Sequence, residues 1–358
     1  MNPILKHRKK IDHIDSQILN LLSTRGKLAK EIGRVKKLKG GVVYVPDREK
    51  LIFNRLSRIN HGPYKTESIL SIFREIISAT RALEAPLRIT YLGPMATFTH
   101  MAAVKYFGSS SELTPANSIS MIFEEVEKGH TDYGVVPIEN TTEGVVSHTL
   151  DMFTSSTLKV CAEIVLKVTH HLLSVESNLK AIKEVYSHPH ALAQCRQWLL
   201  THLPQAKLRE VESTARAAQI AAHKRGAAAI ASEIASSVYG LPILKKTIQD
   251  QTKNYTRFLI IGEHDSKPTG DDKTSILFIA KDEVGALYKI LEPFYKQKVN
   301  LTKIESRPLK SKAWEYVFFV DIDGHYQDRR VAKTLELVKK KCTLFQVLGS
   351  YPKSPILN

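Results

Sequence analysis

The chain has 358 residues, of which 43% are hydrophobic and 25% are charged, and a formal net charge of +16. This length predicts two or three domains, and the composition is that of a globular protein, which excludes disorder as the default. No run of about 18 apolar residues could span a bilayer, so we expect no membrane partner. The charged N-terminus lacks a signal-peptide stretch, and three widely spaced cysteines suit a reducing compartment. We therefore expect a cytoplasmic protein.

Most of the positive charge lies at the front of the chain. Residues 1–60 contain fifteen Lys/Arg and five Asp/Glu, a net of +10. Charge alone fits either a nucleic-acid-binding face or a pocket for a small polyanion beside a solvated basic surface. The segment lacks interleaved aromatics and a recognised DNA-binding motif, so no nucleic acid partner is expected.

The first segment predicts three helices. Apolar residues from Ile11 to Val35 recur at steps of three and four, in a stripe about three turns longer than an average helix. A helix of this length cannot fold back on itself, so we expect the stripe to pack on another chain. Gly40-Gly41 should end it, and further helices are expected over residues 46–58 and 66–83.

After a break at Ala85-Pro86, short apolar runs alternate with helical patterns. This alternation indicates an α/β region with mostly parallel sheets, large enough for two lobes with a cleft between them. Strands are expected at 87–93, 133–137, 160–168, 184–187, 228–231 and 257–262, and helices at 118–128, 192–200 and 214–223.

A polar linker at 265–272 precedes the last segment, which has the order βαββαβ in about 80 residues and is typical of a ferredoxin-like domain. Its strands are expected at 274–280, 300–306, 313–321 and 344–349, and its helices at 284–297 and 328–341.

Several polar residues interrupt the apolar stripes of the first segment. Arg25 lies on the stripe of the long helix, and a buried charge there must be paired or bind a ligand. Lys36 lies three turns later on the same face, whereas Arg8 falls about a quarter turn off it and could reach a pocket of a partner chain. The alternative is that Arg8 and Lys36 are ordinary surface cations. Thr80 and Glu84 point inward from the third helix, unless Glu84 is only its frayed end.

Residues 5–84 resemble the all-helical chorismate mutases. The resemblance rests on Leu5-x-x-Arg8-x-x-Ile11-x-x-x-Asp15, on Arg25-x-x-Leu28-Ala29-x-Glu31-Ile32-Gly33-x-x-Lys36, and on Asp47-Arg48-Glu49. It implies interlocked chains and a site for chorismate formed by Arg8 of a partner chain, Arg25, Lys36, Arg48, Glu49, Thr80 and Glu84.

In that family fixed cations hold the substrate folded and stabilise charge on the breaking C–O bond. The resemblance implies that Lys36 donates to the ether oxygen and that Glu49 accepts from the substrate hydroxyl. Glu84 departs from a common glutamine, so it must be protonated to donate to the ether oxygen.

Residues 87–264 resemble prephenate dehydratase. The matching motifs are Tyr91-Leu92-Gly93-Pro94, residues 136–144 (VPIENTTEG), Ser187-His188-Pro189, Gln194-Cys195, Glu212-Ser213-Thr214 and Asn254-Tyr255-Thr256-Arg257-Phe258. Polar groups at strand ends are where open α/β folds place ligands, although single copies would be turn residues and helix caps.

The dehydratase resemblance implies that Thr256 donates to the departing hydroxyl. Arg257 is expected either to face a carboxylate or to pair with Glu139. The expected prephenate site comprises Glu139, Asn140, Thr141, Ser187, Gln194, Thr256 and Arg257. Met95-Ala96 and His190 depart from the family pattern. No cofactor is expected, and His188-x-His190 is interpreted as loop chemistry and not as a metal site.

Residues 274–352 resemble the ACT regulatory domain. In prephenate dehydratases two motifs of this domain flank phenylalanine between two chains, and here they correspond to Gly285, Ala286, Leu287 and to Glu305, Ser306, Arg307, Pro308. The alternative is a ferredoxin-like domain without a ligand.

Together the resemblances imply an all-α mutase domain at 1–86, a two-lobed, periplasmic-binding-protein-like α/β dehydratase domain at 87–264, and an α+β ACT domain at 273–352. We expect a homodimer or higher oligomer that converts chorismate to prephenate and prephenate to phenylpyruvate, with feedback inhibition by L-phenylalanine. A phenylalanine-binding regulator with a decayed dehydratase lobe and a nucleic-acid-binding protein are the competing hypotheses.

Overall fold

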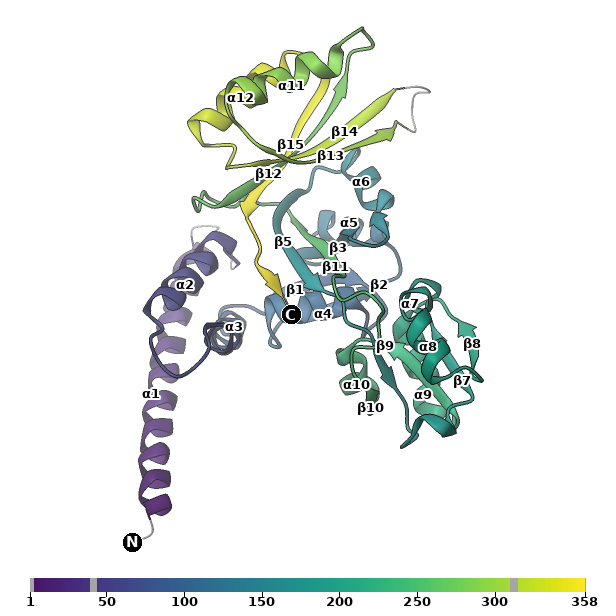
Figure 1. Cartoon of the computed structure of the whole chain (residues 1–358). Coiled ribbons are helices and arrows are strands. Elements are labelled where there is room, and N and C mark those ends of the chain that lie inside the picture. The colour runs from purple at the N-terminus through teal and green to yellow at the C-terminus, as the bar shows by residue number, and fades with distance from the viewer. Residues whose placement is uncertain (1–2, 39–43, 310–314, 358) are drawn as a thin grey trace. The chain divides into compact units, whose positions relative to one another are not determined.

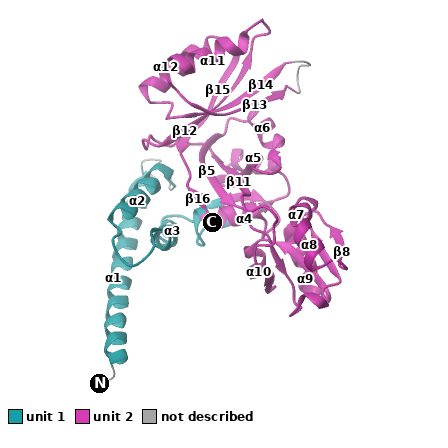
Figure 2. Cartoon of the chain, in the orientation of Figure 1, with its two compact units in different colours: residues 1–88, 106–112 teal, residues 89–105, 113–358 magenta. Residues whose placement is uncertain are grey.

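The computed structural model describes residues 3–38, 44–309 and 315–357, which form two compact units (Figures 1 and 2). Unit 1 comprises residues 1–88 and 106–112, and unit 2 comprises residues 89–105 and 113–358. Unit 1 thus takes in a short piece of chain beyond the expected boundary at Pro86. The dehydratase and ACT segments share unit 2.

Unit 1 is built on three helices, α1 (Pro3–Leu38), α2 (Pro46–Ile59) and α3 (Thr66–Ala82). The three expected helices are confirmed, including the continuous long one. The expected helix terminator at 40–41 lies outside the described residues. The apolar stripe of α1 stays exposed in the single chain, as Ile14 and Ile18 show.

A different face of α1 packs on α3. It consists of small residues one turn apart, Gly26, Ala29 and Gly33, all of which are buried. The absence of side chains there lets the end of α3 approach closely: a Cβ added at Gly33 would lie 3.0 Å from Glu84 Cγ. This close packing sets Glu84 beside α1.

Residues 106–112 join unit 1 through polar and aromatic contacts. Tyr44 and Tyr106 share a hydrogen bond between their hydroxyls at 2.8 Å. Arg81, only 6% exposed, donates to the carbonyl of Phe107 at 2.5 Å and lies over the rings of Tyr44 and Phe107. Ser109 donates to Glu75. The mutase segment is therefore completed by residues that follow it in the chain.

The first sheet of unit 2 has the order β16-β5-β11-β3-β1-β2, with β4 paired to β3. Neighbours β1 and β3 are parallel, as are β16 and β5, but β11 runs antiparallel to both β3 and β5. The expectation of mostly parallel sheets was therefore wrong, because the chain returns from the second lobe to fill the gap between β3 and β5. The strands are β1 (Arg88–Leu92), β2 (Glu112–Ala116), β3 (Tyr133–Asn140), β4 (Gly144–Val145), β5 (Lys159–Lys167), β11 (Tyr255–Gly262) and β16 (Ile356–Leu357), and the helices of this part are α4 (Phe98–Phe107), α5 (Ile119–Glu127) and α6 (Ser147–Phe153).

The second lobe contains a five-stranded sheet of order β10-β6-β9-β7-β8, in which only the β7–β8 and β7–β9 pairs are parallel. The expected helix at 192–200 is two helices, because Cys195 leaves helical geometry at φ −115° and ψ 14°. The elements are β6 (His171–Leu173), η1 (Leu179–Ala181), β7 (Glu184–Ser187), α7 (Pro189–Gln194), α8 (Arg196–His202), β8 (Lys207–Glu210), α9 (Thr214–His223), β9 (Ala227–Ala231), α10 (Glu233–Tyr239) and β10 (Ile243–Lys245).

The third sheet, of order β13-β14-β12-β15, is antiparallel throughout and carries α11 and α12. The βαββαβ order is confirmed, although the expected strand start at 313 lies outside the described residues. Leu277, Phe319 and Leu348 of this sheet share one core cluster with Val160 and Leu259 of the first sheet. The elements are β12 (Asp272–Ala280), α11 (Ala286–Lys296), β13 (Leu301–Pro308), β14 (Tyr316–Asp323), α12 (Arg329–Lys339) and β15 (Cys342–Pro352).

Among the described residues, no helix is both long and apolar enough to cross a membrane.

Candidate active sites

In unit 1 the structure gathers four of the expected chorismate residues where α1 meets α3. Arg25 donates to the hydroxyl of Thr80 and, at 3.3 Å, to the carbonyl of Ile76. Lys36 Nζ lies 3.4 Å from Glu84 Oε2. These side chains are partly buried, and burial lowers the pKa of Arg25 although Glu49 opposes the shift. The contact between α1 and the α3 segment therefore carries two cations and a carboxyl group.

Glu49 is held by a residue that the sequence did not single out. Its carboxylate forms an ion pair of 2.5 Å with Arg81, which is itself anchored by the carbonyl of Phe107. Burial raises the pKa of Glu49, and Arg81 counteracts that shift. The signal in the sequence was weak, because Arg81 directly follows Thr80 and reads as a basic residue of a last helical turn.

Arg8 and Arg48 do not join this cluster in the single chain. Both are exposed. Arg8 precedes Arg25 by seventeen residues of one straight helix, which is about 25 Å along the axis. Arg8 therefore cannot reach the Arg25 site of its own chain.

In unit 2 a cavity of about 510 Å³ lies between the two lobes. It is lined by three of the expected prephenate residues, Asn140, Gln194 and Thr256, together with Asn254 and His170. The quoted motifs also contribute Leu92, Gly93, Glu143, Gly144, His188, Glu212, Ser213 and Thr214 to the wall, and residues next to these motifs contribute 97–99, 145–146 and 190–191. The polar groups at strand ends therefore do converge on one site.

The orientation of the Asn140 amide follows from the backbone. Its Oδ1 accepts hydrogen bonds from the backbone N–H groups of Thr142 at 2.8 Å and Glu143 at 3.0 Å. A backbone N–H can only donate, so the other terminal atom is the NH₂ group. That group donates to Thr256 Oγ1 at 2.8 Å and to Asn254 Oδ1 at 2.9 Å. Thr256 therefore accepts, and no acceptor for its own hydrogen appears in the described part of the chain.

The same logic extends across the cavity to the second lobe. Asn254 donates to Gln194 Oε1 at 2.8 Å, and this oxygen also lies 2.9 Å from His170 Nε2, which must therefore carry a proton. Burial lowers the pKa of His170 to about 4, against the effect of the Gln194 hydrogen bond, so the ring is neutral at neutral pH. A buried neutral histidine thus fixes the amide of Gln194.

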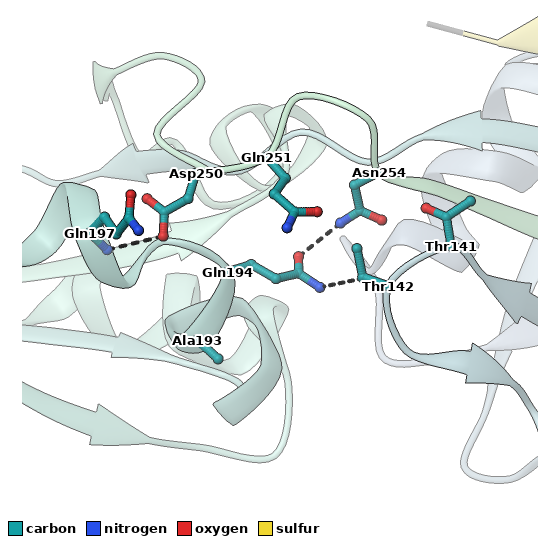
Figure 3. Close-up of a pocket in the computed structure, with 8 residues that line it drawn as sticks. All are labelled: Thr141, Thr142, Ala193, Gln194, Gln197, Asp250, Gln251 and Asn254. Atoms are coloured by element: carbon teal, nitrogen blue, oxygen red, sulfur yellow. Dashed lines mark hydrogen bonds between the residues drawn. The ribbon is translucent and has the colours of Figure 1, made fainter.

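Gln194 links the two lobes directly. Its Nε2 donates to Thr142 Oγ1 at 2.9 Å (Figure 3). The same atom donates to Glu143 Oε1 at 3.0 Å. A second, polar cavity of about 590 Å³ shares Gln194 and Asn254 as part of its wall and is also lined by Thr141 (Figure 3). Thr141 thus faces the neighbouring cavity and accepts from the N–H of Tyr255 at 3.0 Å.

Three other expected prephenate residues lie off the cavity wall. Ser187 is fully buried and donates to the carbonyl of Ile230 at 2.7 Å. Arg257 does not pair with Glu139; it forms ion pairs with Glu163 and with Asp321 of the ACT sheet. Successive residues of a strand point to opposite faces, so Arg257 and Thr256 face opposite sides of β11. Sequence motifs alone could not separate these two faces.

Two departures from the family pattern also have a structural outcome. Ala96 adopts a left-handed backbone with φ +70°, so alanine occupies a conformation that favours glycine. His190 lies 3.1 Å from the carboxylate of Glu143.

The two expected phenylalanine motifs lie at the same end of the ACT segment. Gly285, at φ +76°, opens α11 together with Ala286 and Leu287. Because α11 runs antiparallel to β13, the strand end at Glu305, Ser306, Arg307 and Pro308 lies on that side too. Arg307 donates to Ser147 at 2.6 Å and approaches Asp151 to 3.5 Å, so its guanidinium contacts α6.

Comparisons with known proteins match each of the three segments to a family. Family models match chorismate mutase type II at residues 7–85, prephenate dehydratase at 89–266 and the ACT domain at 274–336. Curated bifunctional chorismate mutase/prephenate dehydratases from Aquifex aeolicus and Stutzerimonas stutzeri are 52% and 44% identical, covering 99% and 97% of both chains. A crystal structure of prephenate dehydratase from Arthrobacter aurescens in complex with L-Phe is 34% identical, with a TM-score of 0.69, and the match covers 74% of this chain and 89% of that one. The chain therefore belongs to the family of bifunctional chorismate mutase/prephenate dehydratase enzymes.

Proposed function

We propose that prephenate is dehydrated in the cavity between the two lobes and that Thr256 donates to the ring hydroxyl as it leaves. One observation carries this proposal. The backbone fixes the amide of Asn140 so that its NH₂ group donates to Thr256, which leaves the threonine hydrogen available to a ligand. If the NH₂ group of Asn140 were absent, the Thr256 hydroxyl could donate its hydrogen to the protein and not to the substrate.

The chemistry requires such a donor. Prephenate loses a carboxylate as carbon dioxide, and the electrons of that C–C bond enter the ring as the C–O bond at the far carbon breaks. The oxygen leaves as water once it has gained a proton, so a hydrogen-bond donor at this oxygen stabilises the charge that grows on it. Asn140 and Gln194 orient the substrate, and neutral His170 holds Gln194.

The experiment follows both products from chorismate. Purified protein should form prephenate first and phenylpyruvate after it. Formation of prephenate alone would refute the dehydratase proposal and favour a regulator with a decayed lobe. Salt-dependent retention on DNA with no turnover of chorismate would favour the nucleic-acid-binding hypothesis.

For the mutase reaction we infer a site completed by a second chain. Arg25, Lys36, Thr80 and Glu84 lie along the contact between α1 and the α3 segment, but Arg8 is about 25 Å from Arg25 along α1. The stripe of α1 that includes Ile14 and Ile18 is exposed in the single chain and would be buried by a second copy of the helix. Arg8 of that copy would then bind one carboxylate of chorismate and Arg25 the other, with Lys36 donating to the ether oxygen. Arg48 and Glu49 would complete the polar wall.

Subunit complementation tests the shared site. Arg8→Ala and Arg25→Ala should each abolish mutase activity in homo-oligomers. After the two variants are unfolded and refolded together, half of the dimers are mixed, and each mixed dimer has one intact site. Activity should therefore return to about a quarter of the wild-type value. No recovery, with mixed dimers demonstrated by a size-tagged chain, would show that both arginines act within one chain.

We also propose that phenylalanine binds the ACT segment and inhibits dehydration. The ACT family model, the relative crystallised with L-Phe, and the two motifs at one end of the α11–β13 unit support this. Gly285→Leu should relieve inhibition, because leucine strains the backbone at φ +76° where α11 begins. Unchanged phenylalanine binding by calorimetry in Gly285→Leu and in Arg307→Ala would exclude this site. The cytoplasmic location expected from the sequence stays a prediction.

A further inference from the structure

Strands β3 and β11 carry two neighbouring residue pairs with opposite orientations. In their register Asn140 faces Thr256, and the next pair along is Glu139 with Arg257. Because side chains alternate along a strand, the first pair points to the cavity and the second to the other face of the sheet. Asn140 and Thr256 are therefore the sequence neighbours of Glu139 and Arg257, whose side chains lie on the opposite face of the sheet.

Both residues of the second pair are ion-paired to the ACT sheet. Arg257 Nη1 lies 2.6 Å from Asp321 Oδ2, and its Nη2 donates to the hydroxyl of Tyr351 at 2.9 Å. Lys303 Nζ lies 2.7 Å from Glu139 Oε2. Two strands of the catalytic sheet are thus held by three strands of the regulatory one, β13, β14 and β15.

The contacts of Arg257 belong to a closed and neutral network. Glu163 accepts from Arg257 Nε at 2.7 Å and from Lys273 at 2.8 Å, and Ser275 donates to Asp321 at 2.5 Å. Two cations therefore balance two carboxylates, and Glu163 is only 3% exposed. A buried charge without its partner is unfavourable, so separating one of these side chains from the network is costly.

The backbone is irregular at this same point. The register of β11 against β3 shifts between Arg257 and Phe258, directly after the residue pair described above. A bulge of this kind redirects the side chains beside it, so the position of Thr256 depends on how the bulge is held. The ion pairs of Glu139 with Lys303 and of Arg257 with Asp321 lie directly beside this irregularity.

We infer that Glu139 and Arg257 are positioning residues for the dehydration: by tying β3 and β11 to the ACT sheet, they keep Asn140 in place to direct the Thr256 hydroxyl. A ligand on the ACT segment that shifts Lys303 or Asp321 would then change turnover without touching the cavity. The regulatory part of this inference rests on the proposed inhibition by phenylalanine. The positioning part rests only on the proposed role of Thr256.

The simpler alternative is that these ion pairs only attach the ACT segment. The chain offers a matched control for it. Arg307 lies on the same strand as Lys303 and pairs with Asp151 of α6, a helix that contributes no residue to the cavity wall. Asp151→Asn weakens the attachment at a comparable point without touching β3 or β11.

The test uses the Glu139–Lys303 pair, because the Glu139 side chain is 38% exposed and its variants should fold. Full-length Glu139→Lys, Lys303→Glu and the double variant are compared with Asp151→Asn, with the mutase rate of each chain as an internal standard of active protein. We expect each single charge reversal to lower the dehydratase kcat at least tenfold with KM within threefold. The double variant should recover most of kcat and of phenylalanine inhibition, and Asp151→Asn should keep a wild-type kcat.

Two outcomes would overturn the inference. One is a wild-type kcat in both single variants. The other is an equal loss in Asp151→Asn, which would reduce the pairs to attachment. Absence of phenylalanine inhibition in the wild-type protein would remove the proposed regulation, whereas the kcat comparison would still decide the positioning role. Thermal unfolding of each variant separates a loss of kcat from a loss of fold.

Discussion

Asn140→Asp replaces a hydrogen-bond donor by an acceptor, and the proposed role of Thr256 depends on that donor. The substitution keeps the size of the side chain and the acceptor that receives the N–H groups of Thr142 and Glu143. It replaces the NH₂ group that donates to Thr256 at 2.8 Å and to Asn254 at 2.9 Å by a second oxygen. Thr256 would then turn its hydrogen to the new carboxylate and away from the substrate.

The expected loss can be estimated from what Thr256 would no longer do. A positioned proton donor contributes about 10²- to 10⁴-fold to a rate, which corresponds to about 2.7–5.4 kcal/mol in activation free energy. The dehydratase kcat of the variant should therefore be lower than the wild-type value by a factor within this range. The second carboxylate oxygen of the variant would also face Asn254 Oδ1, which is another acceptor, so the free energy of unfolding should fall by about 1–3 kcal/mol.

The assay is formation of phenylpyruvate from saturating prephenate, with urea unfolding in parallel. Asn178→Asp is the matched control, because the same substitution there keeps the oxygen that caps η1 and lies outside the cavity wall. It should leave kcat unchanged. A wild-type kcat in Asn140→Asp, with prephenate still bound, would refute the argument that the Asn140 amide directs Thr256.

Three further predictions concern the mutase site and pH. Because Glu84 lies 3.4 Å from Lys36, Glu84→Gln, whose amide always carries a donor, should retain mutase activity, whereas Glu84→Ala should lose it; wild-type mutase activity in Glu84→Ala would place Glu84 outside the site. Gly33→Ala should lower mutase activity while sparing the dehydratase, because its Cβ would meet Glu84 Cγ at 3.0 Å and displace the carboxyl group that lies beside Lys36. Burial lowers the pKa of His170 to about 4, so it contributes stability that is complete above the unfolded value of about 6.5 and is lost as pH falls toward 4. Between pH 7 and pH 5, wild-type protein should therefore lose about 2 kcal/mol more than His170→Gln in urea unfolding, and equal losses would contradict the buried neutral ring.

The sequence could predict the elements whose periodicity is strong. The long helix α1, the α3 helix and the βαββαβ order of the ACT segment follow from regular spacing of apolar residues. The short, polar strand β8 (Lys207–Glu210) was not predicted, because all of its residues are exposed and its sequence shows no alternation of apolar and polar residues. The antiparallel entry of β11 could not be predicted either, because strand direction within a sheet is decided by contacts distant in sequence.

The candidate sites were predictable in type and only partly in membership. Motifs placed Asn140, Gln194 and Thr256 in one expected group, and all three line the same cavity. Arg257 looked equivalent to its neighbour Thr256, and only the pleat of β11 separates them. His170 carried no distinguishing signal, since a histidine after a strand is common. Its importance follows from burial and from its hydrogen bond to Gln194.

The most direct test of the central claim gives chorismate to the Thr256→Val variant and follows chorismate, prephenate and phenylpyruvate together. Valine keeps the shape of threonine and removes only the hydroxyl that Asn140 orients. The account predicts that chorismate disappears at the wild-type rate, because the mutase cluster lies in unit 1, while prephenate accumulates and phenylpyruvate forms at least about 100-fold more slowly. Phenylpyruvate formation at the wild-type rate, or an equal loss of both reactions in a folded protein, would contradict it.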